Sequence, residues 1–278
     1  MIDNIKINSV NEITQLLTNY KYDDSIKRYR SYYLYRGLSD SSFSLQTSLQ
    51  RNCKGKKKEL ETNLLRNFVK YALAENERIA DSKWYQLAIG QHHGLPTRML
   101  DWTYSPLMAL HFSVSEQSFK DFPEHDSVVW GIEIEEMNSL LPQKYKEILD
   151  QEKAFFFTID MLKRITSSLE EYDNDMSNIM DPVSGKTHSA MVLLEPPSID
   201  QRIINQYSDF SIIPDCMDNI EEFLEQNTNK TKKFIIDKSI RWEIRDLLDT
   251  LNINERIVYP GLDGLASWLK RHYYVIDK

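Results

Sequence analysis

The segment QHHGLPTRMLDWTYSP, residues 91–106, is the most informative stretch of this 278-residue chain. It begins at the end of a predicted helix over residues 84–92, because Gly94 is a typical helix stop. It ends at Ser105-Pro106, which opens a predicted helix over residues 107–116 with proline at the first helical position. The polar residues between these helices form a connection, and functional side chains concentrate on connections held by a rigid scaffold.

Hydrophobic periodicity along the rest of the chain predicts an α+β fold, with a mixed central sheet of short strands and flanking helices. Apolar residues recur at intervals of three and four over residues 57–77, which predicts a long helix. Strands are predicted at residues 31–36, 127–134, 190–194, 210–213 and 233–236, and further helices at 11–20, 240–251 and 262–274.

No shift in composition marks a domain boundary, so residues 1–278 are predicted to form a single domain. Within it, residues 1–30 are expected to be a helical N-terminal extension. Residues 173–187 (DNDMSNIMDPVSGKT) are rich in turn formers and are expected to be an exposed loop.

Composition is that of an ordinary globular protein, with 41% hydrophobic and 27% charged residues. A net charge of −8 does not favour nucleic-acid binding, which usually needs a basic face. No apolar run is long enough for a membrane span, and the N-terminus lacks the features of a signal peptide. Cys53 and Cys216 show no disulfide or metal pattern, so a cytoplasmic location is expected.

Several well-known catalytic and cofactor motifs are absent from the sequence. His92 and His93 are adjacent, so on a helix they point about 100° apart and cannot hold one ion. Neither HExxH nor CxxC occurs, and no metal is expected. The signatures GxSxG, GxxxxGK[ST] and GxGxxG are also missing.

Three residues of the opening segment are interpreted as structural. Arg98 and Asp101 are three residues apart and could pair, which would brace the connection. Trp102 is more typical of a core residue than of a stacking platform. Asp101 and Trp102 precede Thr103, whose hydroxyl is a candidate for ligand contact.

Arg36 is the second informative position. It ends the aromatic stretch Ser31–Arg36 (SYYLYR) and is followed by Gly37, where a backbone can approach closely. Its planar guanidinium suits phosphate or carboxylate oxygens. An ordinary ion pair with an acidic residue is the alternative. Arg202 and Gln206, four residues apart, would share one face if their segment is helical.

These residues together resemble the FRG domain family. The family's aromatic-Arg-Gly motif corresponds to Tyr35-Arg36-Gly37, and its run Gln-His-x-Gly-Leu-Pro-Thr-Arg-x-Leu-Asp-Trp-Thr-x-Ser-Pro corresponds to residues 91–106. Weaker similarity continues through residues 202–210 and 257–269. Members of the family often occur in bacterial conflict or phage-defence settings, and the family name supplies no reaction.

The order of elements is also similar to that of ADP-ribosyltransferases of the arginine-serine-glutamate type. This resemblance implies that Arg36 holds the phosphates of NAD and that a strand with Thr103 leads into the proline-capped helix. The third motif would be residues 206–213, but no glutamate precedes Phe210. Gln206 or Asp209 would have to replace it, although glutamine cannot act as a general base. Glu195 is a further candidate.

The resemblance predicts a nucleotide-using effector that transfers ADP-ribose from NAD to a protein or nucleic-acid acceptor. A toxin or phage-defence role implies an antitoxin or defence-system partner. One alternative is a non-catalytic module that senses a nucleotide or partner, and another is a nuclease with His92 or His93 as general acid/base. The catalytic candidates are Arg36, His92, Thr103, Gln206 and Asp209, and the NAD-binding candidates are Tyr35, Arg36, Gly37, Gln91, Thr97 and Thr103.

Overall fold

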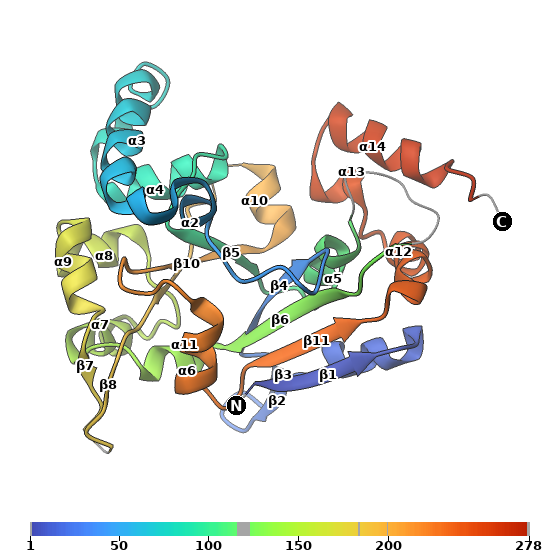
Figure 1. Ribbon diagram of the computed structural model, residues 1–278, viewed down its shortest axis with the longest axis horizontal. Helices are drawn as coiled ribbons and strands as arrows, with labels where there is room; N and C mark the ends of the chain where they lie inside the picture. Colours follow the sequence, from blue (N-terminus) through green and yellow to red (C-terminus); the bar gives the residue numbers. More distant parts are fainter. Residues whose placement is uncertain (1, 116–122, 183, 199, 277–278) are drawn as a thin grey trace.

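A computed structural model describes residues 2–115, 123–182, 184–198 and 200–276 (Figure 1). Its centre is a seven-stranded sheet in the order β1-β11-β6-β4-β5-β10-β9. All neighbouring strands are antiparallel except β1 and β11, which are parallel. The strands are β1 (Asp3–Ile7), β4 (Tyr33–Leu38), β5 (Met99–Thr103), β6 (Ser127–Glu133), β9 (Val192–Leu194), β10 (Ser208–Ile212) and β11 (Lys232–Ile236).

Helices flank this sheet, so the expected α+β fold with a mixed sheet is confirmed. The helices that concern the site are α3 (Lys57–Ala72), α4 (Lys83–His92), α5 (Pro106–Val114), α9 (Leu169–Asp175) and α10 (Gln201–Gln206). The remaining α-helices are α1 (Thr14–Leu17), α2 (Ser48–Cys53), α6 (Ile134–Ser139), α7 (Gln143–Glu152), α8 (Ile159–Ile165), α11 (Ile220–Asn227), α12 (Arg241–Thr250), α13 (Glu255–Val258) and α14 (Leu262–His272).

Two separate sets of helices cover one face of the sheet. On the β4, β6 and β11 side, Tyr35 packs in a cluster with residues of α5 and α12. On the β5, β10 and β9 side, Met99 packs in a cluster with residues of α4, α7, α8 and α9. Tyr35 pairs with Thr103, which is four residues from Met99 along β5, so both clusters lie on the same face of the sheet. The boundary between them therefore falls at the junction of β4 and β5.

Local sequence explains how α5 reaches this junction. The Ser105 hydroxyl accepts a hydrogen bond from the backbone N–H of Met108, and Pro106 occupies the first turn of α5. A Cβ atom on Gly37 would lie 1.9 Å from the carbonyl oxygen of Ala109 in α5. Glycine thus lets α5 lie directly on β4.

Three expectations need correction. Residues 1–30 are not a helical extension: their described part, residues 2–30, contains β1, a short helical turn, and a hairpin of β2 (Lys21–Asp23) and β3 (Arg28–Arg30). The connection expected between the two helices contains β5, a central strand. Residues 173–187 include the end of α9 and a hairpin of β7 (Ile179–Met180) and β8 (Thr187–His188) instead of a plain loop.

The other predicted elements agree with the structure to within a few residues. The helix expected at 57–77 ends at Ala72 and is followed by a 3₁₀ turn at Glu77–Ala80. The strand expected at 127–134 is β6, whose residues are all buried, as a central apolar strand requires. Residue 116, at the end of the predicted 107–116 helix, lies outside the described residues.

Candidate functional site

A cavity of about 380 Å³ lies where β4 and β5 separate. These strands pair only through Tyr35 and Thr103, whereas β4 pairs with β6 along its whole length. The lining residues come from β4 and the segment after it, α4, β5, α5 and α10 with the start of β10: Tyr35, Arg36, Gly37, Leu38, Ser39, Phe43, Gln91, Asp101, Trp102, Thr103, Phe112, Arg202, Gln206 and Ser208. We call this cavity the Arg36 cleft.

The Arg36 side chain bridges the two diverging strands. Its Nη1 donates a hydrogen bond to the backbone carbonyl of Asp101 at 2.7 Å and lies 3.5 Å from the carboxylate Oδ2 of the same residue. Only 17% of the side chain is exposed, and Nε has no hydrogen-bond partner among the described residues. Burial lowers the pKa of Arg36 and the Asp101 carboxylate opposes this, yet an arginine remains charged at neutral pH. The cleft therefore holds a cation with an unused donor.

A chain of side-chain hydrogen bonds fixes the Asp101 carboxylate, which is 52% exposed. The Gln91 amide nitrogen donates to both carboxylate oxygens at 2.9 Å. The orientation of that amide is set by Thr97, whose hydroxyl donates to the Gln91 carbonyl oxygen. Thr97 is itself fully buried and does not line the cleft, so its place is behind Gln91.

Thr103 and Gln206 both line the cleft, but their polar groups are engaged within the protein. The Thr103 hydroxyl donates to the Gln206 carbonyl at 2.7 Å and accepts from the backbone N–H of Ser105. The Gln206 side-chain nitrogen donates to the carbonyl of Val258 at 3.1 Å. These contacts attach β5 to α10 and α10 to α13.

Two of the catalytic candidates lie outside the cleft lining. Asp209 pairs in register with Trp102, so it lies on the opposite face of β10 from Ser208. Its carboxyl is buried, Oδ2 has no partner among the described residues, and burial with the nearby Glu195 charge raises the pKa of Asp209 to about 8. The Nε2 atom of His92 contacts the carboxylate of Asp200, the residue that caps α10. Its position therefore gives the nuclease hypothesis no support.

Five lining residues were absent from the sequence-based candidates: Leu38, Ser39, Phe43, Phe112 and Ser208. Phe43 and Phe112 supply aromatic rings, and Ser208 supplies a hydroxyl at the start of β10. Phe43 is more than half exposed, which is unusual for a phenylalanine, but only the structure shows this and the sequence gave no signal for it. Phe112 gave no signal either, because the largely apolar α5 is typical of a core helix.

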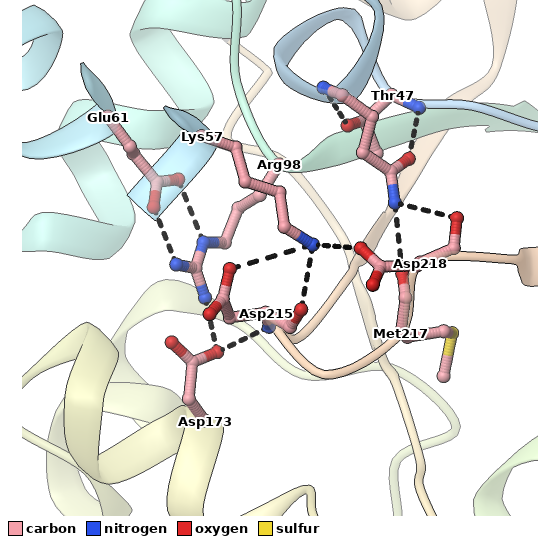
Figure 2. Close-up of polar contacts among 9 residues, drawn as sticks. Thr47, Lys57, Glu61, Arg98, Asp173, Asp215, Met217 and Asp218 are labelled. Atoms are coloured by element: carbon pink, nitrogen blue, oxygen red, sulfur yellow. Dashed lines mark hydrogen bonds and ion pairs between the residues drawn. The ribbon is translucent and has the colours of Figure 1, made fainter. Parts of the chain in front are cut away.

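Arg98 is a brace, but it does not pair with Asp101. Figure 2 shows its guanidinium between Glu61 of α3 and Asp173 of α9. Nε and Nη2 donate to the two Glu61 oxygens at 2.8 and 2.5 Å, and Nη1 donates to Asp173 at 2.6 Å. Burial acts to lower the pKa of Arg98, but the two carboxylates outweigh it and raise the value. We call these three residues the Arg98 brace.

The Arg98 brace continues into a second cation, Lys57, on the same helix as Glu61. Its ammonium donates to the Asp215 carbonyl at 2.7 Å and to the Asp218 carboxylate at 2.6 Å. The segment after β10 is thereby attached to α3.

Trp102 has the expected core position, since it is buried and its indole N–H donates to the Ser211 hydroxyl at 2.9 Å.

Among the described ranges, no group of three or more His, Cys, Asp or Glu side chains could hold a metal ion. Within that part of the chain, no helix has the length and apolar character to cross a membrane.

Fold and cleft define an α+β protein whose polar, arginine-containing cavity opens between two diverging central strands. The sequence model of the FRG domain matches residues 31–121, which include both Tyr35-Arg36-Gly37 and the 91–106 segment. The chain therefore contains an FRG domain, and the family resemblance is confirmed. No curated protein and no solved structure matched the chain, so the similarity to ADP-ribosyltransferases has no further support from these comparisons.

Proposed function

We propose that the Arg36 cleft binds NAD as a substrate and transfers its ADP-ribose group to an acceptor. The observation that carries this proposal is the Arg36 guanidinium in the cleft lining, of whose nitrogens only Nη1 donates a hydrogen bond within the described residues. A phosphate oxygen that enters the cleft would gain a charge-assisted hydrogen bond from this cation. Arg202, also in the lining, adds a second guanidinium for a diphosphate.

The arrangement of the three sequence motifs supports the same proposal. Arg36, Thr103 and the Gln206–Ser208 segment lie on or beside β4, β5 and β10, which are neighbours in the sheet. All three line one cavity, as the resemblance to ADP-ribosyltransferases implies. The rings of Phe43 and Phe112 provide apolar surface for a base or for nicotinamide.

The transfer itself requires a group that stabilises positive charge on the ribose. The bond between nicotinamide and ribose C1′ breaks, and nicotinamide leaves with the electron pair. The acceptor atom then bonds to C1′ and loses a proton. Among the lining residues, Asp101 is the one carboxylate, and its charge makes it the group to stabilise the ribose cation or to accept that proton.

The biological setting follows from the family. FRG domains often occur in bacterial conflict systems, so we propose a toxin or phage-defence effector with a protein or nucleic-acid acceptor. An antitoxin or defence-system partner and a cytoplasmic location belong to the same proposal.

Labelled NAD incubated with the purified protein and a cell extract tests this function. We expect nicotinamide release and a labelled acceptor with the wild type, and loss of both with Arg36→Ala. Arg66→Ala, which removes an exposed arginine hydrogen-bonded to Asn63, is the matched control and should retain activity. The proposal is wrong if the wild type neither binds nor consumes NAD.

A second function is favoured by one specific observation. Asp101 is already held by Gln91 and Arg36, and no glutamate lines the cleft. A pocket without a free carboxylate suits a non-catalytic module that senses a nucleotide. Calorimetric titration separates the two functions, since this module binds NAD or another nucleotide without turnover.

A further inference from the structure

Helix α14 exposes several apolar residues and buries the charged residue Arg271 on its inner side, which is unusual for a surface helix. Leu262, Leu269 and Tyr273 are 82%, 39% and 76% exposed, and Ala266 between them is exposed as well. In Figure 1 the helix lies at the periphery of the molecule, next to α13.

The inner side of α14 is fixed by an ionic network. The buried Arg271 donates to Glu255 at 2.7 and 2.8 Å and to Asp249 at 2.9 and 2.6 Å. Gly264 allows close approach, because a Cβ atom there would lie 1.8 Å from the carbonyl oxygen of Tyr259. The helix is thus held in one orientation, and its outward face is a fixed feature of the surface.

The exposed apolar residues form one narrow stripe. With about 100° per residue, Leu262, Ala266, Leu269 and Tyr273 fall within an arc of about 60°. Tyr273 keeps helical geometry, since its N–H donates to the Leu269 carbonyl. Arg271 lies on the opposite side of the helix. Spacings of four, three and four residues are those of a helix–helix seam, and a contiguous exposed apolar patch marks an interaction site.

We propose that this stripe is a homodimer interface in which α14 packs antiparallel against α14 of a second copy. The charges beside the stripe favour a second copy of this chain as the partner. Asp263 and Lys270 are seven residues apart, so they lie on the same flank, one near each end of the helix. In an antiparallel pair, Asp263 of each copy lies near Lys270 of the other, twice by symmetry. A parallel pair would bring the two acidic ends together and the two basic ends together.

Sedimentation velocity of the full chain over a concentration series tests the interface. We expect a concentration-dependent dimer. The double variant Leu262→Ser/Leu269→Ser should raise the dimer Kd by about tenfold or more, because it removes two apolar side chains from the seam. Leu73→Ser, which changes an exposed leucine at the end of α3, is the matched control and should leave the Kd unchanged.

Charge exchange tests the antiparallel arrangement separately. Asp263→Lys should weaken the dimer, and Asp263→Lys with Lys270→Asp should restore it, since the exchanged pair is again complementary. A monomer at every concentration overturns the proposal, as does a dimer that survives Leu262→Ser/Leu269→Ser. The antiparallel pairing is overturned if Asp263→Lys weakens the dimer and the double exchange does not restore it. None of these outcomes depends on NAD binding.

Discussion

Arg36 and Arg98 are two largely buried arginines of the same FRG segment, yet their surroundings differ. Arg98 has two carboxylates that accept from all three of its nitrogens. Arg36 reaches one backbone carbonyl and a half-exposed carboxylate, and its Nε has no partner among the described residues. An arginine whose three nitrogens all donate to carboxylates is part of the structure. An arginine that lines a cavity and donates through one nitrogen can bind a ligand there, and four predictions test this distinction.

The largest effect is expected at the Arg98 brace. Arg98→Ala should lower the free energy of unfolding by about 3–5 kcal/mol, because it leaves Glu61 and Asp173 without their cation. Urea denaturation measures this loss. Arg98→Met combined with Glu61→Met and Asp173→Asn should recover part of it, since no unpaired charge then remains buried. A loss of less than about 1 kcal/mol for Arg98→Ala would contradict the assignment as a brace.

The same distinction applies to buried carboxyl groups: Asp173 pairs with Arg98, whereas Oδ2 of Asp209 has no partner within the described residues. Burial and then Glu195 raise the pKa of Asp209 to about 8, above its unfolded value of about 3.9. The folded state therefore holds this proton more tightly. The protonated Asp209 carboxyl makes its full contribution to the free energy of unfolding below about pH 4, and this contribution is lost as the pH rises through 8.

Asp209→Asn should remove that pH dependence. We expect the wild type to lose on the order of a few kcal/mol more than the variant between pH 5 and pH 8.5. Urea denaturation at the two pH values gives the difference, and Glu225→Gln on the exposed side of α11 is the control. Parallel pH curves for wild type and Asp209→Asn would contradict a raised pKa.

Arg36→Ala should weaken nucleotide binding while changing stability little. Loss of a charge-assisted contact of about 1.5–3 kcal/mol corresponds to a Kd increase of roughly 10–100-fold. Calorimetry with NAD measures the Kd, and urea denaturation of the same sample measures stability. Arg36→Lys should restore only part of the affinity, because lysine lacks the planar fork. If Arg36→Ala instead unfolds the protein as Arg98→Ala does, the two arginines are not functionally distinct.

Sequence patterns predicted the parts of the fold with strong periodicity and missed those set by distant contacts. The β6 strand and helices α3 and α4 were predicted because their apolar patterns are long or continuous. The central strand β5 (MLDWT) was read as a polar connection, since Asp101 and Thr103 disguise its alternation. Its state is fixed by pairing with β10, more than 100 residues away.

The candidate site could be predicted as a set of segments but not as a geometry. The motifs located Arg36, Gln91 and Thr103, all of which line the cleft. The sequence pattern favoured Asp209, but its neighbour Ser208 is the residue that lines the cavity. Successive side chains of a strand point to opposite faces of the sheet, so an error of one residue places the candidate on the wrong face. Only the register between β5 and β10 decides between these two positions.

The smallest effect on stability is expected at Asp101, and it decides what that carboxylate does. Asp101→Asn should change the free energy of unfolding by about 1 kcal/mol or less, because the side chain is half exposed. The substitution also removes the one carboxylate that lies beside Arg36 in the cleft, so a phosphate meets less competition for the guanidinium. NAD affinity should therefore stay constant or increase.

If Asp101 also stabilises the ribose cation, nicotinamide release should fall at least tenfold while NAD remains bound. Unchanged turnover would restrict Asp101 to orienting Arg36, and a loss of NAD affinity would contradict both roles.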